Sequence, residues 1–157
     1  MDKNFVVRKT IELLEQDLQS VETNIQNLHA TANNAPSPME SWSDSTRRER
    51  QSMASDMENT KNALHQAILL LKNLDASLKL NTIQPGALVT INDGGKESLY
   101  LVVPFGGGKT IMNEDISVKT ITVDSKIGAA LMGKKQGDKT VIALSAGEKS
   151  ISILNVS

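Results

Sequence analysis

The chain has 157 residues, with 17 basic and 18 acidic side chains and a formal net charge of -1, which predicts one or two small domains and argues against a protein that coats a nucleic acid. It contains no cysteine, so disulfides, thiolate zinc sites and cysteine nucleophiles are excluded. No run of about 18 apolar residues and no signal-peptide pattern occurs, so we expect a soluble, cytoplasmic protein without a membrane partner.

The N-terminal half has the pattern of two long helices. Residues 1–80 contain no glycine, and their two prolines, Pro36 and Pro38, lie close together. On both sides of the prolines, apolar side chains recur at alternating spacings of four and three residues, which is typical of a coiled-coil seam. Because proline cannot continue a helix interior, the sequence predicts an antiparallel coiled-coil hairpin over 1–80 with its tip at about 32–43. The seam positions are Val7, Ile11, Leu14, Leu18, Val21, Ile25 and Leu28, then Met53, Met57, Thr60, Leu64, Ala67, Leu71, Leu74 and Leu78.

This hairpin would be long and exposed. Each helix has roughly 28 to 36 residues, so at about 1.5 Å per residue the hairpin projects on the order of 45 Å. Polar and charged side chains occupy the faces away from the seam. We therefore interpret the hairpin as a spacer or a probe, with an intermolecular coil or a helical bundle as alternatives.

Residues 81–157 have a different pattern and contain all ten glycines. A short helix is expected over 125–132, ending at Gly133, and Asn92-Asp93-Gly94-Gly95 is typical of a hairpin turn. The predicted fold class is α+β: an antiparallel coiled-coil hairpin followed by a small, mainly antiparallel β domain with one short helix. The predicted strands cover residues 87–91, 99–103, 119–123, 140–144 and 150–156.

Two patterns suggest catalytic chemistry and fail on closer inspection. The segment 105–110, Phe-Gly-Gly-Gly-Lys-Thr, is similar to a phosphate-binding loop, but no helix is predicted after it, so a hairpin loop is the better interpretation. The two histidines, His29 and His65, lie on different helices; with a bend at the prolines His65 would lie opposite about residue 9, roughly 30 Å from His29. We therefore expect no shared metal, no acid–base pair and no serine hydrolase triad.

The hairpin tip carries a group of charged residues. Glu40 and Asp44 are four residues apart, so they would share a face if the second helix began by Glu40. Two carboxylates at the end of a rod could complete a magnesium shell that another molecule begins. In the simpler interpretation, Asp44 only caps the helix, and Arg47 and Arg48 pair with nearby acids rather than with phosphates.

Residues 121–138 carry a specific order of features. A strand leads into a turn at Ser125-Lys126-Ile127-Gly128, then into a helix that ends in Leu131-Met132-Gly133-Lys134, and then into a Gly137-Asp138 turn. This order and spacing resemble the C-terminal domain signature of the bacterial Gre transcript-cleavage factors, the GreA/GreB family. Residues 85–91, 98–103 and 151–156 are similar to further strands of that domain. With the hairpin in front, the resemblance covers essentially the whole chain.

The resemblance implies a coiled coil joined to an FKBP-like β domain. It also implies a regulator of transcription elongation: the β domain docks at the rim of the secondary channel of bacterial RNA polymerase and the coil enters the channel. Tip carboxylates then help to hold a second magnesium ion, so that the polymerase cleaves the 3' end of backtracked RNA. Such a factor is an accessory protein, not an enzyme. It is expected to be a monomer without a tightly bound cofactor, and to meet the nascent RNA only indirectly.

Site residues follow from the same resemblance. Glu40 matches the tip glutamate of the family, whereas Ser37 stands where the family has aspartate and Asp44 where it has tyrosine. Glu40 and Asp44 are thus the candidates for a magnesium ion shared with the polymerase. Arg47 and Arg48 are the candidates for residues near the RNA.

The docking turn follows the family more closely than the tip. Lys126 replaces the proline of the turn, which leaves Asp124, Ser125 and Ile127 as candidates for polymerase contact. Docking is therefore better supported than stimulation of cleavage. The alternatives are a Gre-like inhibitor that occludes the channel without causing cleavage, and a coiled-coil scaffold that binds another protein.

A prolyl isomerase or chaperone on the FKBP-like fold is a further alternative. It would need an aromatic-lined pocket for proline. Tyr100 and Phe105 are the only aromatic residues in the second half of the chain, so we do not expect this activity.

Overall fold

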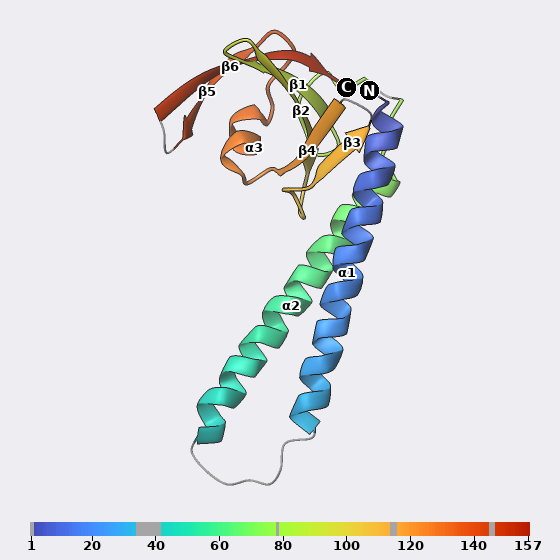
Figure 1. The fold of residues 1–157 in the computed structure, drawn as a ribbon, viewed down its shortest axis with the longest axis vertical. Coiled ribbons are helices and arrows are strands. Elements are labelled where there is room, and N and C mark those ends of the chain that lie inside the picture. Colours follow the sequence, from blue (N-terminus) through green and yellow to red (C-terminus); the bar gives the residue numbers. More distant parts are fainter. Residues whose placement is uncertain (1, 34–41, 78, 114–115, 145–146) are drawn as a thin grey trace.

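The computed structural model describes residues 2–33, 42–77, 79–113, 116–144 and 147–157. It shows a helical hairpin followed by a six-stranded, mainly antiparallel sheet with one short helix, which confirms the predicted fold class (Figure 1). No described helix is both long and apolar enough to cross a membrane. The elements are α1 (Lys3–Asn33), α2 (Trp42–Lys72), β1 (Leu88–Asp93), β2 (Lys96–Val103), β3 (Thr110–Asn113), β4 (Ile116–Thr122), α3 (Lys126–Leu131), β5 (Lys139–Leu144) and β6 (Gly147–Val156).

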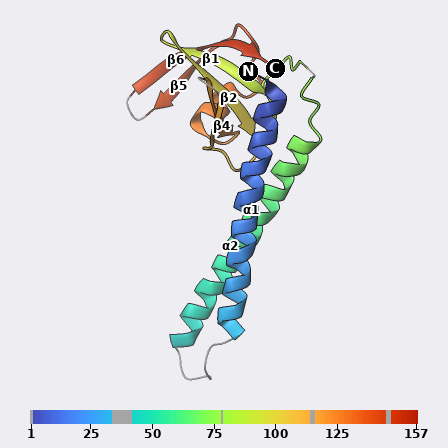
Figure 2. The same ribbon diagram turned by 45° about the vertical axis from the view of Figure 1, so that its right-hand side comes forward.

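The two long helices run antiparallel and project together from the sheet (Figures 1 and 2). Polar side-chain contacts join them at two levels: Lys72 Nζ forms an ion pair with Glu15 Oε1 at 2.7 Å, and His65 Nε2 lies 3.8 Å from Glu22 Oε1. On each helix the two paired residues are seven positions apart, which is one heptad. The spacing of the pairs therefore matches the predicted antiparallel coiled coil.

The position predicted for His65 is wrong, because His65 faces Glu22 and not residue 9. The prediction assumes a bend at the prolines, whereas these contacts set a register that is centred further along the chain. Among the described residues, no group of three or more histidine, cysteine, aspartate or glutamate side chains could hold a metal ion.

The seam is buried along the part of the hairpin near the sheet, where Leu14 is 0% exposed and Leu64 is also buried. Met53, predicted as a seam position, is instead 56% exposed. The two helices diverge toward the outer end of the hairpin, where α2 begins (Figure 1). The seam prediction therefore fails at Met53.

The base of the hairpin also packs against one face of the sheet, which the seam pattern does not predict. Val6 and Ile68 lie beside the seam, and both are buried. They belong to an aliphatic cluster that the helices share with the strands, so the hairpin and the sheet have one common core at their joint. The cluster contains Val6, Val7, Leu14, Leu64, Ala67, Ile68 and Leu71 from the helices, and Leu88, Leu101, Val103, Ile111 and Val118 from the strands.

The strand order of the sheet is β3-β4-β2-β1-β6-β5. All neighbouring strands are antiparallel except β2 and β4, which are parallel because β3 returns the chain between them. Each predicted strand is present. The pattern did not indicate β3, because this strand has four residues and only Ile111 among them is buried.

The turn between β1 and β2 has the backbone conformation that its glycines predict. Gly94 and Gly95 have φ values of +60° and +96°, a backbone region that side chains disfavour. Asn92 Oδ1 accepts a hydrogen bond from the N–H of Gly95 at 2.7 Å. Two consecutive positive φ values are typical of the tight turns whose twist matches that of the flanking strands.

The opposite face of the sheet carries the second core, which includes α3. Side chains alternate between faces along a strand, so Val102 enters this core while Leu101 and Val103 enter the first. Both cores are almost entirely aliphatic, as the scarcity of aromatic residues predicts. The buried members of the second core are Ile83, Ala87, Val89, Ile91, Val102, Ile121, Leu131, Ile142, Ile151, Ile153 and Val156.

The two ends of the chain lie beside each other at the sheet, far from the outer end of the hairpin (Figures 1 and 2). The C-terminal residue is held in the sheet. Ser157 donates its N–H to the carbonyl oxygen of Leu88 at 3.0 Å, and Leu88 donates its N–H to the carbonyl oxygen of Ser157 at 2.8 Å.

Lys3 is an unusual member of the joint, because it is only 6% exposed. Within the described residues its Nζ has no hydrogen-bond partner. Burial lowers the pKa of Lys3 below its ordinary value, and attraction to Asp75 opposes this shift. A charged amine that is buried without a hydrogen bond destabilises the folded state.

We expect Lys3→Met to raise the free energy of unfolding by about 1 kcal/mol at pH 7, because methionine keeps the unbranched shape and removes the unpaired amine. In the wild type, the unfolded chain binds more protons than the folded one between the lowered pKa and the ordinary value of 10.5. Stability therefore rises with pH through that window. Urea titrations at pH 7 and near 10.5 should show this rise in the wild type and not in Lys3→Met. The exposed residue Lys79 provides the control, since Lys79→Met should keep the rise.

Candidate functional site

The two groups of predicted site residues lie at opposite ends of the molecule. The tip residues are at the start of α2, at the outer end of the hairpin, whereas the turn before α3 lies beside the sheet (Figure 1). A helix of 31 residues, the length of α2, spans about 45 Å. The structure therefore does not bring the two groups together, and a single partner that meets both must be large.

At the tip, Glu40 lies outside the described residues. Asp44 and Arg47 are in the first two turns of α2, and their side chains are also outside the described part. Arg48, in the second turn, is exposed. The start of α2 at Trp42 places Asp44 in the first turn, where the helix dipole favours an acidic residue.

The turn predicted to contact a partner, residues 124–127, is built around Ser125. Its backbone is extended, with φ -66° and ψ 154°, and its side chain caps α3. The Oγ accepts a hydrogen bond from the N–H of Gly128 at 3.0 Å and donates one to the carbonyl oxygen of Thr122 at 2.7 Å. A cap of this kind satisfies an N–H group that has no partner inside the helix. Ser125 therefore has a structural role in the turn that the sequence prediction did not include.

Glycines define both ends of α3. At the start, a Cβ on Gly128 would lie only 2.0 Å from the carbonyl oxygen of Thr122. At the end, the N–H of Met132 donates to the carbonyl oxygen of Gly128 at 2.9 Å. Gly133 follows with φ +74° and donates its N–H to the carbonyl oxygen of Ile83 at 2.9 Å. The predicted glycine stop is confirmed, and it ties the helix to the segment before β1.

The other residues predicted to contact a partner differ in exposure. Asp124 is exposed, whereas Ile127 is half-buried and packs against the second core. Lys126, where the family has proline, is also exposed. The surface that the turn offers to a partner thus consists mainly of one negative and one positive side chain on either side of Ser125.

The glycine-rich segment 105–110 is not followed by a helix, as predicted, because β3 begins at Thr110. The segment instead contacts the hairpin, where Lys109 Nζ lies 2.5 Å from Asp17 Oδ2. No sequence pattern pairs these two residues, since they are far apart in the chain and Asp17 is not on the seam.

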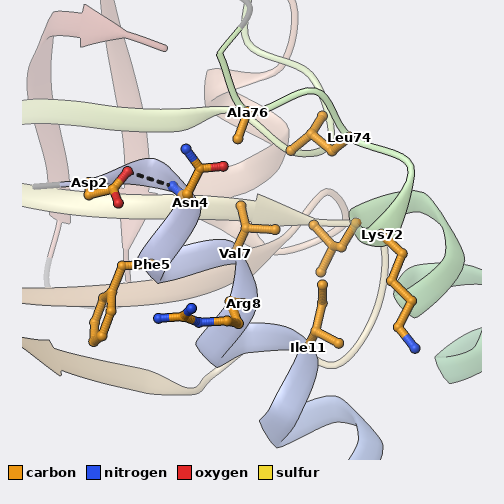
Figure 3. Close-up of a pocket in the computed structure, with 10 residues that line it drawn as sticks. Asp2, Asn4, Phe5, Val7, Arg8, Ile11, Lys72, Leu74 and Ala76 are labelled. Atoms are coloured by element: carbon orange, nitrogen blue, oxygen red, sulfur yellow. Dashed lines mark hydrogen bonds between the residues drawn. The ribbon is translucent and has the colours of Figure 1, made fainter.

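A pocket at the base of the hairpin is lined by the first turns of α1 and by the end of α2 (Figure 3). The charged groups of Arg8 and Lys72 do not point toward each other there, and Asp2 Oδ1 accepts a hydrogen bond from the backbone N–H of Asn4 in α1. Among the aromatic residues, Phe5 lines this pocket, whereas Tyr100 and Phe105 of the β domain do not.

The fold and these surfaces define a two-part protein, in which a projecting helical hairpin shares a core with a β domain that carries a capped turn. The family described as "Transcription elongation factor, GreA/GreB, C-term" matches residues 78–157, slightly more than half of the 157 residues. The chain belongs to the GreA/GreB family of transcription elongation factors. The resemblance carried by residues 121–138 is therefore confirmed.

Solved structures of similar proteins include GreA factor homolog 1 (Gfh1) of Thermus thermophilus, which is 15% identical with a TM-score of 0.38 over 100% of this chain and 96% of its own. Gfh1 of Thermus aquaticus is 18% identical with a TM-score of 0.39 over 99% and 95%. The elongation factor GreA/GreB from Nitrosomonas europaea is 16% identical with a TM-score of 0.38 over 60% and 79%. At these values the likeness adds nothing to the family assignment. No curated protein matches the chain.

Proposed function

We propose that the protein binds bacterial RNA polymerase at its secondary channel and regulates transcript elongation from there. The observation that supports this most strongly is a long hairpin that projects freely while its base is fixed in a common core with the sheet. Its 31-residue helices supply a reach of about 45 Å. Leu14 and Leu64, buried at the joint, keep the base of the hairpin attached to the β domain.

In this proposal the two parts of the chain have different tasks. Residues 81–157 dock on the rim of the channel through the turn that contains Asp124, and residues 1–80 enter the channel with the tip in front. The membership of the family supports the role in elongation. The separation of the two candidate surfaces by the length of the hairpin suits a partner with a deep channel.

The chemistry proposed for the tip needs only side chains that the chain possesses. Glu40 and Asp44 would supply carboxylate oxygens to a magnesium ion held jointly with the polymerase, and magnesium commonly takes one or two protein carboxylates. A second metal in phosphoryl chemistry stabilises the attacking and leaving oxygens. The guanidinium groups of Arg47 and Arg48 would pair with RNA phosphates. The reaction itself stays in the active site of the polymerase, to which this protein is an accessory.

Docking is tested by competition. The protein should displace a labelled Gre factor from bacterial RNA polymerase, and Asp124→Ala should weaken this competition roughly two- to five-fold, the range of an exposed charge pair. Glu148→Ala, at an exposed position on β6, provides a control with the same change of charge. If the wild type does not compete at any concentration, the channel proposal is wrong.

Cleavage is tested on a stalled, backtracked polymerase complex. The wild type should increase the rate of RNA 3'-end cleavage, and Glu40→Ala and Asp44→Ala should each lower that rate about ten-fold or more while still competing for the channel. Glu49→Ala, an exposed acidic position in α2, is the matched control. Competition without any increase in cleavage would identify an occluding factor and contradict the magnesium role of the tip.

A further inference from the structure

The glycine segment between β2 and β3 contacts both parts of the molecule. It follows β2 at the joint, where β3 passes beside α1 (Figure 1). The segment has no role in the channel proposal, and it is followed by β3 rather than by the helix that a phosphate-binding loop requires. Its contacts instead indicate a mechanical role, which residues Gly106, Gly107, Gly108 and Lys109 carry. We call these four residues the lock.

On the hairpin side, Gly106 provides a socket for Leu14. A Cβ on Gly106 would lie 2.3 Å from Leu14 Cδ2 and 3.3 Å from Leu64 Cδ2. The backbone of Gly106 also has φ +74°, which other residues rarely adopt. Because Leu14 is fully buried, it has little space into which it could move. The close approach of the loop to the hairpin therefore depends on glycine at this position.

Lys109 adds a directional contact to the same helix. Its ammonium group pairs with Asp17, three residues after Leu14 and hence on a neighbouring part of the same face of α1. Aliphatic contacts in the common core are not directional, so by themselves they permit the hairpin to pivot on the sheet. A socket and an ion pair on one face of α1 oppose such a pivot.

On the sheet side, the lock is held by Thr120 of β4. Gly108 donates its N–H to the carbonyl oxygen of Thr120 at 2.8 Å, and Thr120 donates its N–H to the carbonyl oxygen of Lys109 at 2.8 Å. Lys109 also donates its N–H to Thr120 Oγ1 at 2.9 Å. Thr120 is itself buried, so the lock is fixed to a strand inside the sheet.

The same contacts lead on to the docking turn. A Cβ on Gly107 would lie 2.8 Å from the backbone nitrogen of Thr122, so the lock packs closely against the end of β4. The carbonyl oxygen of Thr122 in turn accepts the hydrogen bond from Ser125 Oγ. A continuous series of close contacts thus joins α1 to the turn before α3.

We propose that the lock fixes the angle between the hairpin and the sheet, and thereby sets the direction in which the hairpin projects from the docking turn. Lys109 and Asp17 are positioning residues in this arrangement. The consequence for the polymerase rests on the proposed function, whereas the lock itself is a property of the free protein. The two can therefore fail independently.

The first test measures the angle directly. Because the chain has no cysteine, Ser55→Cys on α2 and Ser150→Cys on β6 allow two spin labels at exposed positions of the full-length protein. Gly106→Ala should shift and broaden the distance distribution between these labels. Gly108→Ala is the matched control, since Gly108 also has a positive φ, +86°, but a Cβ there meets nothing within 4 Å. If Gly106→Ala and Gly108→Ala give the same distribution of spin-label distances, the close approach of Gly106 to Leu14 does not set the angle of the hairpin.

The second test uses charge and does not depend on a tight core. Lys109→Asp should broaden the distribution because it places two carboxylates together, and Lys119→Asp, at an exposed position of β4, is the control with the same change of charge. The double exchange Asp17→Lys with Lys109→Asp should restore the wild-type distribution. A double exchange that behaves like Lys109→Asp alone would show that the pair does not position the hairpin.

The polymerase assays then separate the lock from the channel proposal. If the wild type competes for the channel, Lys109→Asp should weaken competition roughly two- to five-fold, and the double exchange should recover it. If the wild type does not compete for the channel but the spin-label distances respond as described, the lock is supported and the channel proposal is wrong. Unchanged distances in both Gly106→Ala and Lys109→Asp would remove the lock, whatever the polymerase assay shows.

Discussion

Replacing Leu14 by alanine is expected to lower the free energy of unfolding by about 3 kcal/mol. Leu14 is 0% exposed and belongs to the core that the helices share with the sheet. Alanine would leave a cavity between the hairpin, the strands and Gly106, and neighbours in a shared core can fill it only in part. Denaturant unfolding followed by far-ultraviolet circular dichroism measures the change.

Leu69→Ala is the matched control, since Leu69 lies on α2 but is 51% exposed. We expect it to cost less than about 1 kcal/mol. A single unfolding transition in Leu14→Ala would show that the hairpin and the sheet still unfold together. If the two variants cost the same, the common core at the joint is not a major source of stability.

Gly128→Ala is expected to destabilise the protein by about 3 kcal/mol, although alanine is normally the better helix former by about 1 kcal/mol. The reason is steric: the added Cβ would lie 2.0 Å from the carbonyl oxygen of Thr122, a backbone atom that cannot rotate away. The same carbonyl accepts the hydrogen bond from Ser125, so the turn would have to open. Thermal and urea unfolding measure the loss.

The reverse exchange at the next residue provides the control. Ala129 is exposed on α3, and Ala129→Gly should cost only about 1 kcal/mol, the difference in helix propensity. Equal or greater stability of Gly128→Ala relative to the wild type would show that the turn adapts to a side chain.

The hairpin could be predicted because a coiled-coil seam is a local repeat. Spacings of four and three residues indicate which positions are buried, and Leu14 and Leu64 are buried as expected. The packing of the hairpin on the sheet could not be predicted in this way. Val6 and Ile68 lie outside the seam positions, so the coiled-coil repeat does not predict their burial. An apolar side chain alone also does not indicate which element it packs against.

The β domain shows the same contrast between local and distant information. The sequence indicates the turn between β1 and β2 and the end of α3, because both need positive φ values that favour glycine. The residues concerned are Gly94, Gly95 and Gly133. The ion pair between Asp17 and Lys109 could not be predicted from the neighbouring residues, because charged side chains are frequent and each could pair with any of several partners. The roles of Glu40 and Asp44 at the tip stay predictions.

The neighbouring ends of the chain have a practical consequence. A short peptide would connect them without crossing the hairpin, so a circularly permuted protein could be opened at the Gly94-Gly95 turn and keep both cores. A fluorescent protein fused to either end would sit at the sheet and leave the outer end of the hairpin unobstructed. Entry of the hairpin into a partner could then be followed in real time with the fusion remaining outside.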